Sequence, residues 1–327
     1  MGAWHDHGGN VAAARAAFPD APTPWLDLST GINPQPWDVS RAGAVYWAAL
    51  PDVAALEALE AAAGRFFGVA PERVCAVPGT EIGLRLLGTL GLPLPMRYRA
   101  PSYGTYGQIG EARPVAERDL EEEASRGGTI LIAQPNNPDG AVLSEAGLHD
   151  IAGRLEAAGG VLVVDEAFAD TQDQPSAAAR LGERVIALRS FGKFFGLAGV
   201  RLGFVLAAPE RLAPLRRQLG SWPVNSAALA IGQAAYGDGA WIGQTRARLR
   251  QQADRLDALL RCHGFEPSGA CPLFRLVSTS NAETLFQRLA AAGILTRPFA
   301  YAPDWLRFGR PGDDAAFERL DRALARG

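Results

Sequence analysis

The stretch S-F-G-K-F-F-G-L-A-G-V-R-L-G, residues Ser190–Gly203, holds the only lysine of the chain, Lys193. The chain has 32 Lys and Arg residues, so every other one of them is an arginine. A lysine amine can lose its proton and form an imine with an aldehyde, whereas a guanidinium effectively stays protonated. The neighbouring Phe191, Phe194 and Phe195 predict partial desolvation, which favours the neutral, nucleophilic amine. An ordinary surface lysine near a loop is the alternative.

Short apolar segments on both sides of this stretch alternate with helical patterns. Five of them predict buried strands, at residues 73–80, 129–138, 160–168, 184–193 and 202–208. The intervening patterns predict helices over Asp52–Phe67, Glu81–Leu90, Glu145–Ala158 (with Ser144 as its N-cap) and Pro209–Leu219. This alternation is typical of an α/β fold with a mostly parallel sheet covered on both faces. In such sheets, ligands bind at the carboxyl ends of the strands.

The length of 327 residues predicts one large and one smaller domain. After Trp222 a long helical stretch runs over Asn225–Cys262, with a break at Gly237–Gly239. Strand-like segments then follow at residues 273–277, 294–299 and 305–309, with helices between and after them, which is typical of an α+β domain. We therefore predict a Pro-rich extended arm over residues 1–40 that joins the small domain, a large domain over 41–222 and a small domain over 223–327.

The composition limits the possible partners and compartments. The net charge is −3, so no basic field indicates nucleic acid binding. No apolar run reaches the roughly 18 residues of a membrane span, and the N-terminus lacks the pattern of a signal peptide. Three widely spaced cysteines suit free thiols in a reducing cytoplasm. The sequence His5-Asp6-His7 lacks a third anchored ligand, so we predict no metal site.

Several other residues near the strand ends fit the chemistry of an imine-forming lysine. Such a lysine points to pyridoxal 5′-phosphate (PLP), whose pyridine nitrogen is usually held by an aspartate. Asp165 ends the segment V-L-V-V-D and is a candidate, although a metal ligand or a helix cap would also fit there. Ser190 and Arg201 flank the lysine and would close on one phosphate. In the loop Pro78–Glu81, Gly79 permits close backbone approach, and free amides at a helix start bind anions.

The ordered set N-P-D-G, D-E-A-F and S-x-x-K, with Arg at +8 and Gly at +10 from the lysine, resembles fold type I PLP enzymes of the aminotransferase superfamily. The resemblance covers about residues 10–310 and implies the aminotransferase-like fold and PLP as cofactor. It implies that Lys193 is the Schiff-base lysine and Asp165 the partner of the pyridinium. Asn137 would bind the ring 3′-oxygen, and Tyr103 would stack on the ring. The implied cofactor-binding set is Gly79, Thr80, Glu81, Tyr103, Asn137, Asp165, Ser190, Lys193 and Arg201.

Two positions depart from the pattern of this superfamily. Many members carry a tyrosine three residues after the aspartate, where this chain has Phe168. The hydroxyl contact to the 3′-oxygen is therefore missing here. Members also carry a Tyr-Pro-Asp motif whose tyrosine reaches the neighbouring subunit's cofactor phosphate. Here the motif is Leu50-Pro51-Asp52, so either Tyr46 substitutes or the contact is absent.

Four further segments narrow the resemblance. They are H-G-G-N (7–10), W-L-D-L-S-T-G-I-N-P (25–34), S-W-P-V-N (221–225) and L-R-F-G-R-P-G-D (306–313). They resemble the L-threonine-O-3-phosphate decarboxylases of cobalamin biosynthesis, which are close to histidinol-phosphate aminotransferases. The resemblance implies loss of CO₂ from threonine phosphate to give (R)-1-amino-2-propanol O-2-phosphate. It also implies a homodimer with active sites at the subunit interface.

The resemblance places the substrate in the same segments. Arg307 would grip the substrate carboxylate, and His7, Asn10 and Arg310 are candidates for the substrate phosphate. A capping or solvent-facing residue is the alternative for His7, and a surface ion pair is the alternative for Arg307. The full candidate set for substrate is His7, Asn10, Gly31, Asn33, Asn225, Arg307 and Arg310.

Three other functions can be compared with the same residues. A histidinol-phosphate-type aminotransferase would share the fold, because fold does not fix the reaction. A non-catalytic PLP-binding scaffold or regulator would bind cofactor without turnover, but an intact lysine, aspartate and arginine argue against it. A nucleotide-binding protein is disfavoured because G-T-E-I-G lacks the Gly-Lys-Thr/Ser of a P-loop.

Overall fold

The computed structural model describes residue 4 and residues 8–325, and the chain divides into two compact units. The smaller unit contains the described residues up to Gln35, the loop Pro138–Ala141 and the described residues from Gln244 onward. The larger unit contains Pro36–Asn137 and Val142–Gly243. The sequence placed these boundaries after residues 40 and 222. In the structure they lie after Gln35 and Gly243, so the second boundary is 21 residues further along the chain than the sequence placed it.

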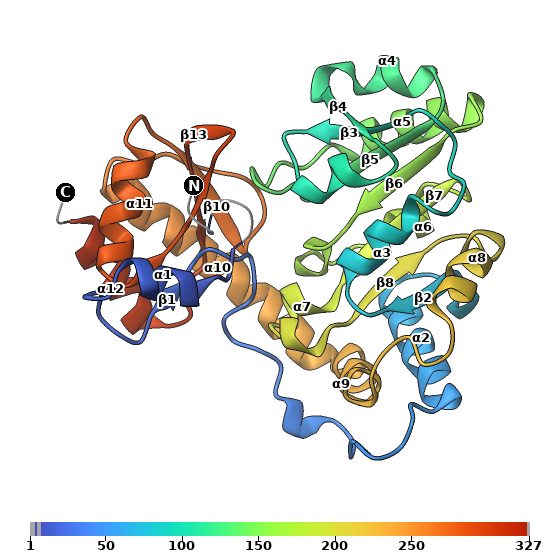
Figure 1. The fold of residues 1–327 in the computed structure, drawn as a ribbon, viewed down its shortest axis with the longest axis horizontal. Helices are drawn as coiled ribbons and strands as arrows, with labels where there is room; N and C mark the ends of the chain where they lie inside the picture. The colour runs from blue at the N-terminus through green and yellow to red at the C-terminus, as the bar shows by residue number, and fades with distance from the viewer. Residues whose placement is uncertain (1–3, 5–7, 326–327) are drawn as a thin grey trace. The chain divides into compact units, whose positions relative to one another are not determined.

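A seven-stranded sheet forms the centre of the larger unit, in the order β2-β8-β7-β6-β5-β3-β4 (Figure 1). Among the described strands of this sheet, β8 alone runs opposite to all the others. The predicted mostly parallel sheet is therefore confirmed. The strands are β2 (Val74–Val77), β3 (Met96–Ala100), β4 (Arg113–Ala116), β5 (Thr129–Ala133), β6 (Val161–Asp165), β7 (Val185–Ser190) and β8 (Gly203–Leu206). All five predicted strands are present, whereas β3 and β4 were missed. Both carry arginines or a proline that break the apolar pattern.

Helices cover both faces of this sheet (Figure 1). Apolar residues of β5, β6 and β7 alternate between two cores, so neighbouring residues such as Leu162 and Val163 face opposite sides. Helices α4, α5 and α6 pack on one core, and α3 and α8 pack on the other. The helices of this unit are α2 (Val53–Phe67), α3 (Thr80–Leu87), α4 (Leu120–Ser125), α5 (Glu145–Ala157), α6 (Ala177–Arg180), α7 (Phe191–Phe194), α8 (Pro209–Leu219) and α9 (Ser226–Gly237). The predicted N-cap of α5 is confirmed, since Ser144 accepts a hydrogen bond from the Gly147 amide.

Helix α9 explains why the larger unit extends past Trp222. It packs along α2, and its Ala228 and Leu229 are buried. Gly232 makes close packing possible, because a Cβ there would lie 2.7 Å from Leu59 and 2.6 Å from Leu202. The chain leaves this unit within α10 (Gly239–Cys262), after the break that the glycines predict.

The smaller unit contains a four-stranded antiparallel sheet in the order β12-β13-β10-β9 and a parallel pair formed by β1 and β11. Its strands are β1 (Leu26–Asp27), β9 (Pro267–Ser268), β10 (Phe274–Ser278), β11 (Ile294–Leu295), β12 (Arg297–Phe299) and β13 (Ala302–Gly309). Its helices are α1 (Val11–Ala17), most of α10, α11 (Ala282–Ala291) and α12 (Asp314–Leu324). The N-terminal segment was predicted to join the small domain, and its described residues up to Gln35 do belong to this unit. It was also predicted to be an extended arm rather than a core element. That was wrong, because Ala14 of α1 and Leu28 are buried in the core of this unit.

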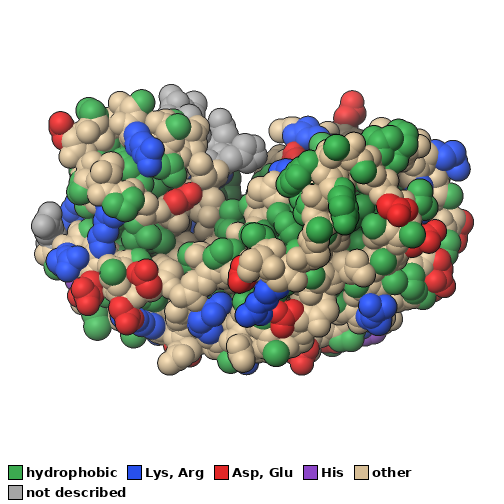
Figure 2. All heavy atoms as spheres, turned by 90° about the horizontal axis from the view of Figure 1, so that it is seen from below, with side chains coloured by type: hydrophobic (Ala, Val, Ile, Leu, Met, Phe, Trp, Pro, Cys, Tyr) green, Lys and Arg blue, Asp and Glu red, His purple; other side chains and the backbone are tan. Residues whose placement is uncertain are grey.

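Charged side chains of both signs are interspersed on the face of the molecule shown in Figure 2. No helix of the described residues is long and apolar enough to cross a membrane. Within the same residues, no group of three or more His, Cys, Asp or Glu side chains is arranged to hold a metal ion.

Candidate active site

The candidate residues fall into two groups, one in each unit. In the larger unit, β2, β3, β5, β6 and β7 run in the same direction, so their carboxyl ends lie at one edge of the sheet. The candidates follow these ends: Gly79 and Thr80 after β2, Tyr103 after β3, Asn137 after β5, Asp165 at the end of β6, and Ser190 and Lys193 at and after the end of β7. The topology thus brings together residues that are far apart in the sequence.

Lys193 lies in the short helix α7, and its side chain is half-buried. Its Nζ is 5.5 Å from the centre of the Phe168 ring. The sequence predicted that the three neighbouring phenylalanines shield the Lys193 amine from water, but Phe168 supplies the ring beside it. The Phe191 and Phe195 rings stack at 4.6 Å and join an aromatic cluster that includes Tyr236. This cluster anchors the backbone of α7, while Phe168 provides a ring beside the amine.

Asp165 is buried, and each of its carboxylate oxygens accepts a hydrogen bond. Oδ1 accepts from the Ala167 amide at 3.0 Å, and Oδ2 accepts from the Tyr106 hydroxyl at 2.7 Å. Burial raises the pKa of Asp165 above its ordinary value, while the Tyr106 and Ala167 hydrogen bonds and the charge of Lys193 lower it. The lysine and the aspartate therefore influence each other electrostatically, as the sequence predicts.

Gly79, Thr80 and Arg201 meet at one place in the larger unit. Gly79 has φ +92°, and a Cβ added to it would lie 2.6 Å from Nη2 of Arg201. Gly203 gives similar room to Thr80, since its Cβ would lie 2.5 Å from the Thr80 amide nitrogen. Ser190 pairs with Gly203 across β7 and β8. The glycines thus let the Arg201 guanidinium and the end of β7 approach the start of α3 closely. A guanidinium and the first amides of a helix are groups that bind an anion.

Arg201 itself adopts a left-handed backbone conformation, with φ +57°. Residues other than glycine rarely adopt this conformation, and strain of this kind is concentrated at functional sites. Its Nη1 donates to the Ala198 carbonyl oxygen at 3.3 Å. The turn therefore directs Arg201 toward Gly79 at an energetic cost.

Tyr103 and Glu81 form a hydrogen-bonded pair. The Tyr103 hydroxyl donates to Oε2 of Glu81 at 3.1 Å, and Thr105 donates to the same carboxylate. Glu81 therefore holds the Tyr103 loop rather than presenting a free carboxylate. Asn136 is buried and fixes the neighbouring loop, because it accepts from Ser102 at 2.7 Å and donates to Pro101.

Asn137 is half-buried next to this structural asparagine. It lies in the loop after β5, at the carboxyl end of a parallel strand, where ligands bind in such sheets.

In the smaller unit, Arg307 is buried on β13. Its Nη2 donates to the Ser29 carbonyl oxygen at 2.7 Å, and its guanidinium lies 5.0 Å from the centre of the Phe274 ring. Burial and the nearby charge of Arg297 lower the pKa of Arg307 to about 10. A guanidinium this destabilised is well suited to receive an anion.

Arg310, directly after β13, is only 2% exposed. Nη2 donates to Oδ1 of Asn33 at 2.8 Å and Nη1 donates to the Pro311 carbonyl oxygen at 3.3 Å. Both of these partners are neutral. Burial and the charge of Arg248 lower the pKa of Arg310 to about 10. The predicted substrate residue Asn33 thus orients Arg310.

The remaining predicted substrate residues have diverse surroundings. Asn10 is exposed and caps α1, accepting from the Ala13 amide at 3.2 Å. Gly31 is buried in the loop that follows β1. Asn225, in the larger unit, caps α9 and donates to the Val200 carbonyl oxygen, so backbone groups engage its amide. His7 lies outside the described residues.

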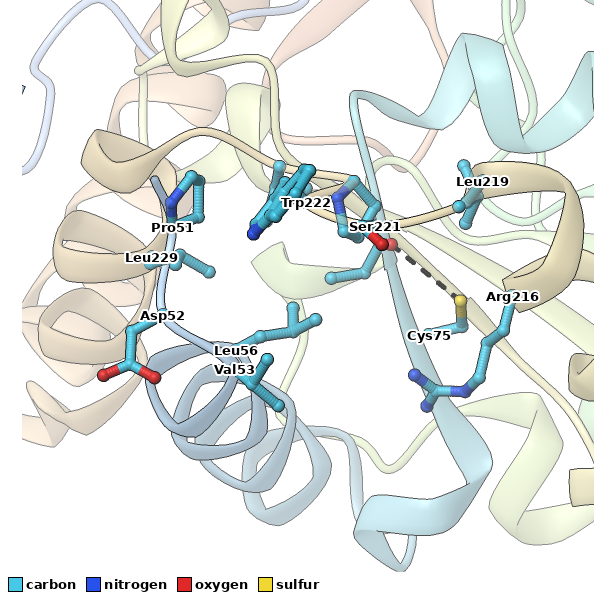
Figure 3. Close-up of a pocket in the computed structure, with 14 residues that line it drawn as sticks. Pro51, Asp52, Val53, Leu56, Cys75, Arg216, Leu219, Ser221, Trp222 and Leu229 are labelled. Atoms are coloured by element: carbon cyan, nitrogen blue, oxygen red, sulfur yellow. Dashed lines mark hydrogen bonds between the residues drawn. The ribbon is translucent and has the colours of Figure 1, made fainter. Parts of the chain in front are cut away.

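A separate cavity of about 290 Å³ lies at the start of α2 (Figure 3). It contains none of the predicted site residues. Burial raises the pKa of the Cys75 thiol on its wall to about 12, so this cysteine is no nucleophile at neutral pH. Arg216 on the same wall is paired with Glu60 at 2.9 Å. This cavity therefore lies apart from the candidate residues, which lie at the sheet edge and in the smaller unit.

Comparison with known proteins places the chain in a family. The family model for aminotransferase class I and II matches residues 114–324. The chain belongs to the aminotransferase class I and II family. A threonine-phosphate decarboxylase from Sinorhizobium sp. is 40% identical over 98% of this chain and 97% of its own length. Another from Pseudomonas aeruginosa is 39% identical, with the same two coverages.

Solved structures share the fold of this family member. Histidinol-phosphate aminotransferase from Sinorhizobium meliloti, in complex with pyridoxal-5′-phosphate, superposes with a TM-score of 0.81. It covers 97% of this chain and 94% of its own, at 19% sequence identity. The expected aminotransferase-like fold is therefore confirmed.

Sequence reasoning missed Tyr106 and Arg248. Tyr106 stands three residues after Tyr103 in a 3-10 helix (Gly104–Gln108), a spacing that places two residues on the same side of the turn. That spacing was the available signal. Arg248 lies among several arginines of α10, and nothing in the sequence distinguishes it from the others.

Proposed function

We propose that this protein uses PLP to decarboxylate L-threonine O-3-phosphate to (R)-1-amino-2-propanol O-2-phosphate in cobalamin biosynthesis. The observation that carries the proposal is the presence of two buried guanidiniums, Arg307 and Arg310, in the smaller unit. Threonine phosphate has two anionic groups, a carboxylate and a phosphate, so each guanidinium has a counterpart. The full-length similarity to two threonine-phosphate decarboxylases supports the same substrate.

The residues at the sheet edge of the larger unit fit PLP. The Arg201 guanidinium, which packs against the Gly79 backbone, would bind the cofactor phosphate together with Ser190 and the first amides of α3. Asp165 would hold the ring nitrogen in its protonated form, and Asn137 would hold the 3′-oxygen. Tyr103 would pack on the ring, and Glu81 fixes that tyrosine. PLP, when bound, supplies an electron sink for the bond that breaks at the substrate Cα.

The arginines of the smaller unit would orient the substrate. Arg307 would bind the carboxylate in a bidentate manner and so set the direction of the bond from Cα to the carboxylate carbon. Arg310, held by Asn33, would bind the substrate phosphate. After CO₂ leaves, Lys193 or a water molecule would return a proton to Cα. The phosphate grip and the carboxylate grip together would therefore favour loss of CO₂ over loss of the Cα proton.

A product assay tests this function. The purified protein with PLP and threonine phosphate is expected to release CO₂ and the amine phosphate, with no glutamate formed when 2-oxoglutarate is added. Glutamate formation without CO₂ would overturn the proposal in favour of an aminotransferase. Cofactor binding without either product would indicate a scaffold or regulator.

We further propose that the protein is a homodimer, and its three free cysteines support a cytoplasmic location. The larger unit exposes large apolar side chains close together in sequence: Tyr46 is 74% exposed and Trp47 is 79% exposed, and Leu50 and Val53 are also exposed. A groove of about 910 Å³ lies between this segment and α9. Exposed apolar groups of this density favour a protein partner.

The cavity at the start of α2 continues this apolar surface. Figure 3 shows Val53 and Leu56 pointing into it from α2, opposite the half-exposed Trp222. Tyr46 is available to a second copy, whereas Leu50 of the altered motif has no hydroxyl to donate. Light scattering tests the proposal: wild type and Leu94→Asp, which alters an exposed leucine outside this surface, should be dimers, and Trp47→Asp a monomer. A monomeric wild type would contradict it.

A further inference from the structure

Tyr106 donates a hydrogen bond to Asp165, and both side chains are buried. Tyr106 is 1% exposed, and its hydroxyl lies 2.7 Å from Oδ2 of Asp165. The contact joins the 3-10 helix after β3 to the end of β6. Two buried polar groups at this distance are strongly coupled, because little water screens them.

The tyrosine remains a hydrogen-bond donor over the whole working range of pH. Burial and the charge of Asp165 raise the pKa of Tyr106 well above its ordinary value. The Tyr98 and Tyr103 rings pack edge-on against its ring at 6.1 and 5.8 Å between centroids, which fixes the direction of the hydroxyl. The phenol therefore stays protonated and directed at the carboxylate.

The charged and titratable groups that act on Asp165 are few. Lys193 lies on α7 and favours the ionised carboxylate, whereas Glu166, next to it on the chain, disfavours that form. The Asp165 charge also acts on Tyr103, so this phenol faces it as well. Burial disfavours the ionised form most, and the Tyr106 hydrogen bond is the largest influence in the opposite direction.

We propose that Tyr106 is a positioning residue that keeps Asp165 ionised and correctly oriented for the ring nitrogen of PLP. The inference rests on the proposed cofactor and goes beyond it, because Tyr106 would act only through Asp165. With Oδ1 held by Ala167 and Oδ2 held by Tyr106, the plane of the carboxylate is fixed by both neighbours. Without the hydroxyl, Asp165 would become protonated at a higher pH and would lose its charge toward the ring.

The test measures the dissociation constant of PLP for the cofactor-free full chain between about pH 5 and about pH 8. A carboxyl group whose pKa is raised above its ordinary value titrates toward the lower end of this range. Tyr106→Phe should weaken PLP binding by about 10-fold at neutral pH, the effect of one hydrogen bond to a charged group, and the loss should grow as the pH falls. Tyr98→Phe is the matched control, because its ring packs on Tyr106 without contacting Asp165, and it should bind like wild type.

A second variant keeps the shape of the tyrosine. Replacing Tyr106 by 3-fluorotyrosine strengthens the donor and should shift the midpoint of the pH profile to lower pH. A loss in Tyr106→Phe that is the same at every pH would overturn the positioning role, as would equal effects in Tyr98→Phe. A wild type that binds no PLP at any pH would instead overturn the proposed function, so the two failures are distinguishable.

Discussion

The two groups of candidate residues differ in how their charges are balanced. In the larger unit, Asp165 is buried beside a lysine and two hydrogen-bond donors, so the protein offsets part of the cost of burying its charge. In the smaller unit, Arg310 is buried against neutral oxygens and beside the charge of another arginine. A compensated site is suited to hold a resident group, whereas an uncompensated cation is suited to a ligand that brings its own negative charge. The comparison therefore assigns the cofactor to one unit and the anionic ends of the substrate to the other.

The largest expected effect is at the larger unit. Lys193→Ala and Lys193→Arg should both lower the rate of CO₂ release by at least about 10⁴-fold, because a guanidinium cannot lose a proton to act as general acid or base. Circular dichroism checks that both variants remain folded. An arginine variant with a tenth of wild-type activity would show that charge alone suffices at this position.

The next effect tests the smaller unit. Arg310→Gln should raise KM for threonine phosphate by about 10- to 100-fold, the contribution of one charge-assisted contact, and should leave the visible spectrum of the bound cofactor unchanged. Arg250→Gln removes the same charge from an exposed position of α10 and should leave KM unchanged. An unchanged KM in Arg310→Gln would remove this arginine from the substrate site.

A smaller effect is expected where the cofactor phosphate would bind. Gly79→Ala places a Cβ against Arg201 at a residue with φ +92°, so it should weaken PLP binding by about 10-fold, equivalent to about 1.4 kcal/mol. Gly199→Ala is the control, because it is exposed and nothing lies within 4 Å of its added Cβ. Equal PLP affinity of the two variants would contradict a phosphate cradle at Gly79.

The smallest effect concerns the pH dependence of stability. The folded protein raises the pKa of Asp165 above 3.8, so the native state binds this proton more tightly than the unfolded state does. Protonated Asp165 therefore contributes to stability below pH 3.8, and this contribution is lost as the pH rises through the pKa of Asp165 in the folded state. Without PLP, Asp165→Asn should be more stable than wild type at neutral pH, by about 1 kcal/mol, the size of a typical single substitution. Urea titrations should show the difference vanishing in acid; a difference that grows in acid would contradict the burial argument.

The sequence predicted most of the sheet and its ligand edge, because buried parallel strands are nearly continuous apolar runs that end in distinctive loops. It missed β3 and β4 since Arg97, Arg99 and Pro114 interrupt their apolar patterns. In the structure Arg97 and Arg99 are buried, and they form ion pairs with Glu123 and Glu117, respectively. Only the fold brings those carboxylates to the arginines, so no local pattern reveals the strands.

The candidate site divides in the same way. Residues near a motif, such as Asp165 and Lys193, were predicted at positions that the fold brings to one edge. Tyr106 was passed over because its role depends on a contact with a residue 59 positions away. The shielding of Lys193 was assigned to its sequence neighbours, whereas Phe168 from another segment supplies the nearby ring. Long-range partners of this kind follow from topology and not from local sequence.

The most direct measurement is the visible absorbance spectrum of the PLP-loaded protein during titration with threonine phosphate and, separately, with threonine. The account predicts an absorbance band of the bound cofactor that shifts at low concentrations of threonine phosphate and only at far higher concentrations of threonine, since threonine lacks the anion for Arg310. The absence of such a band, or the same response to both compounds, would contradict it.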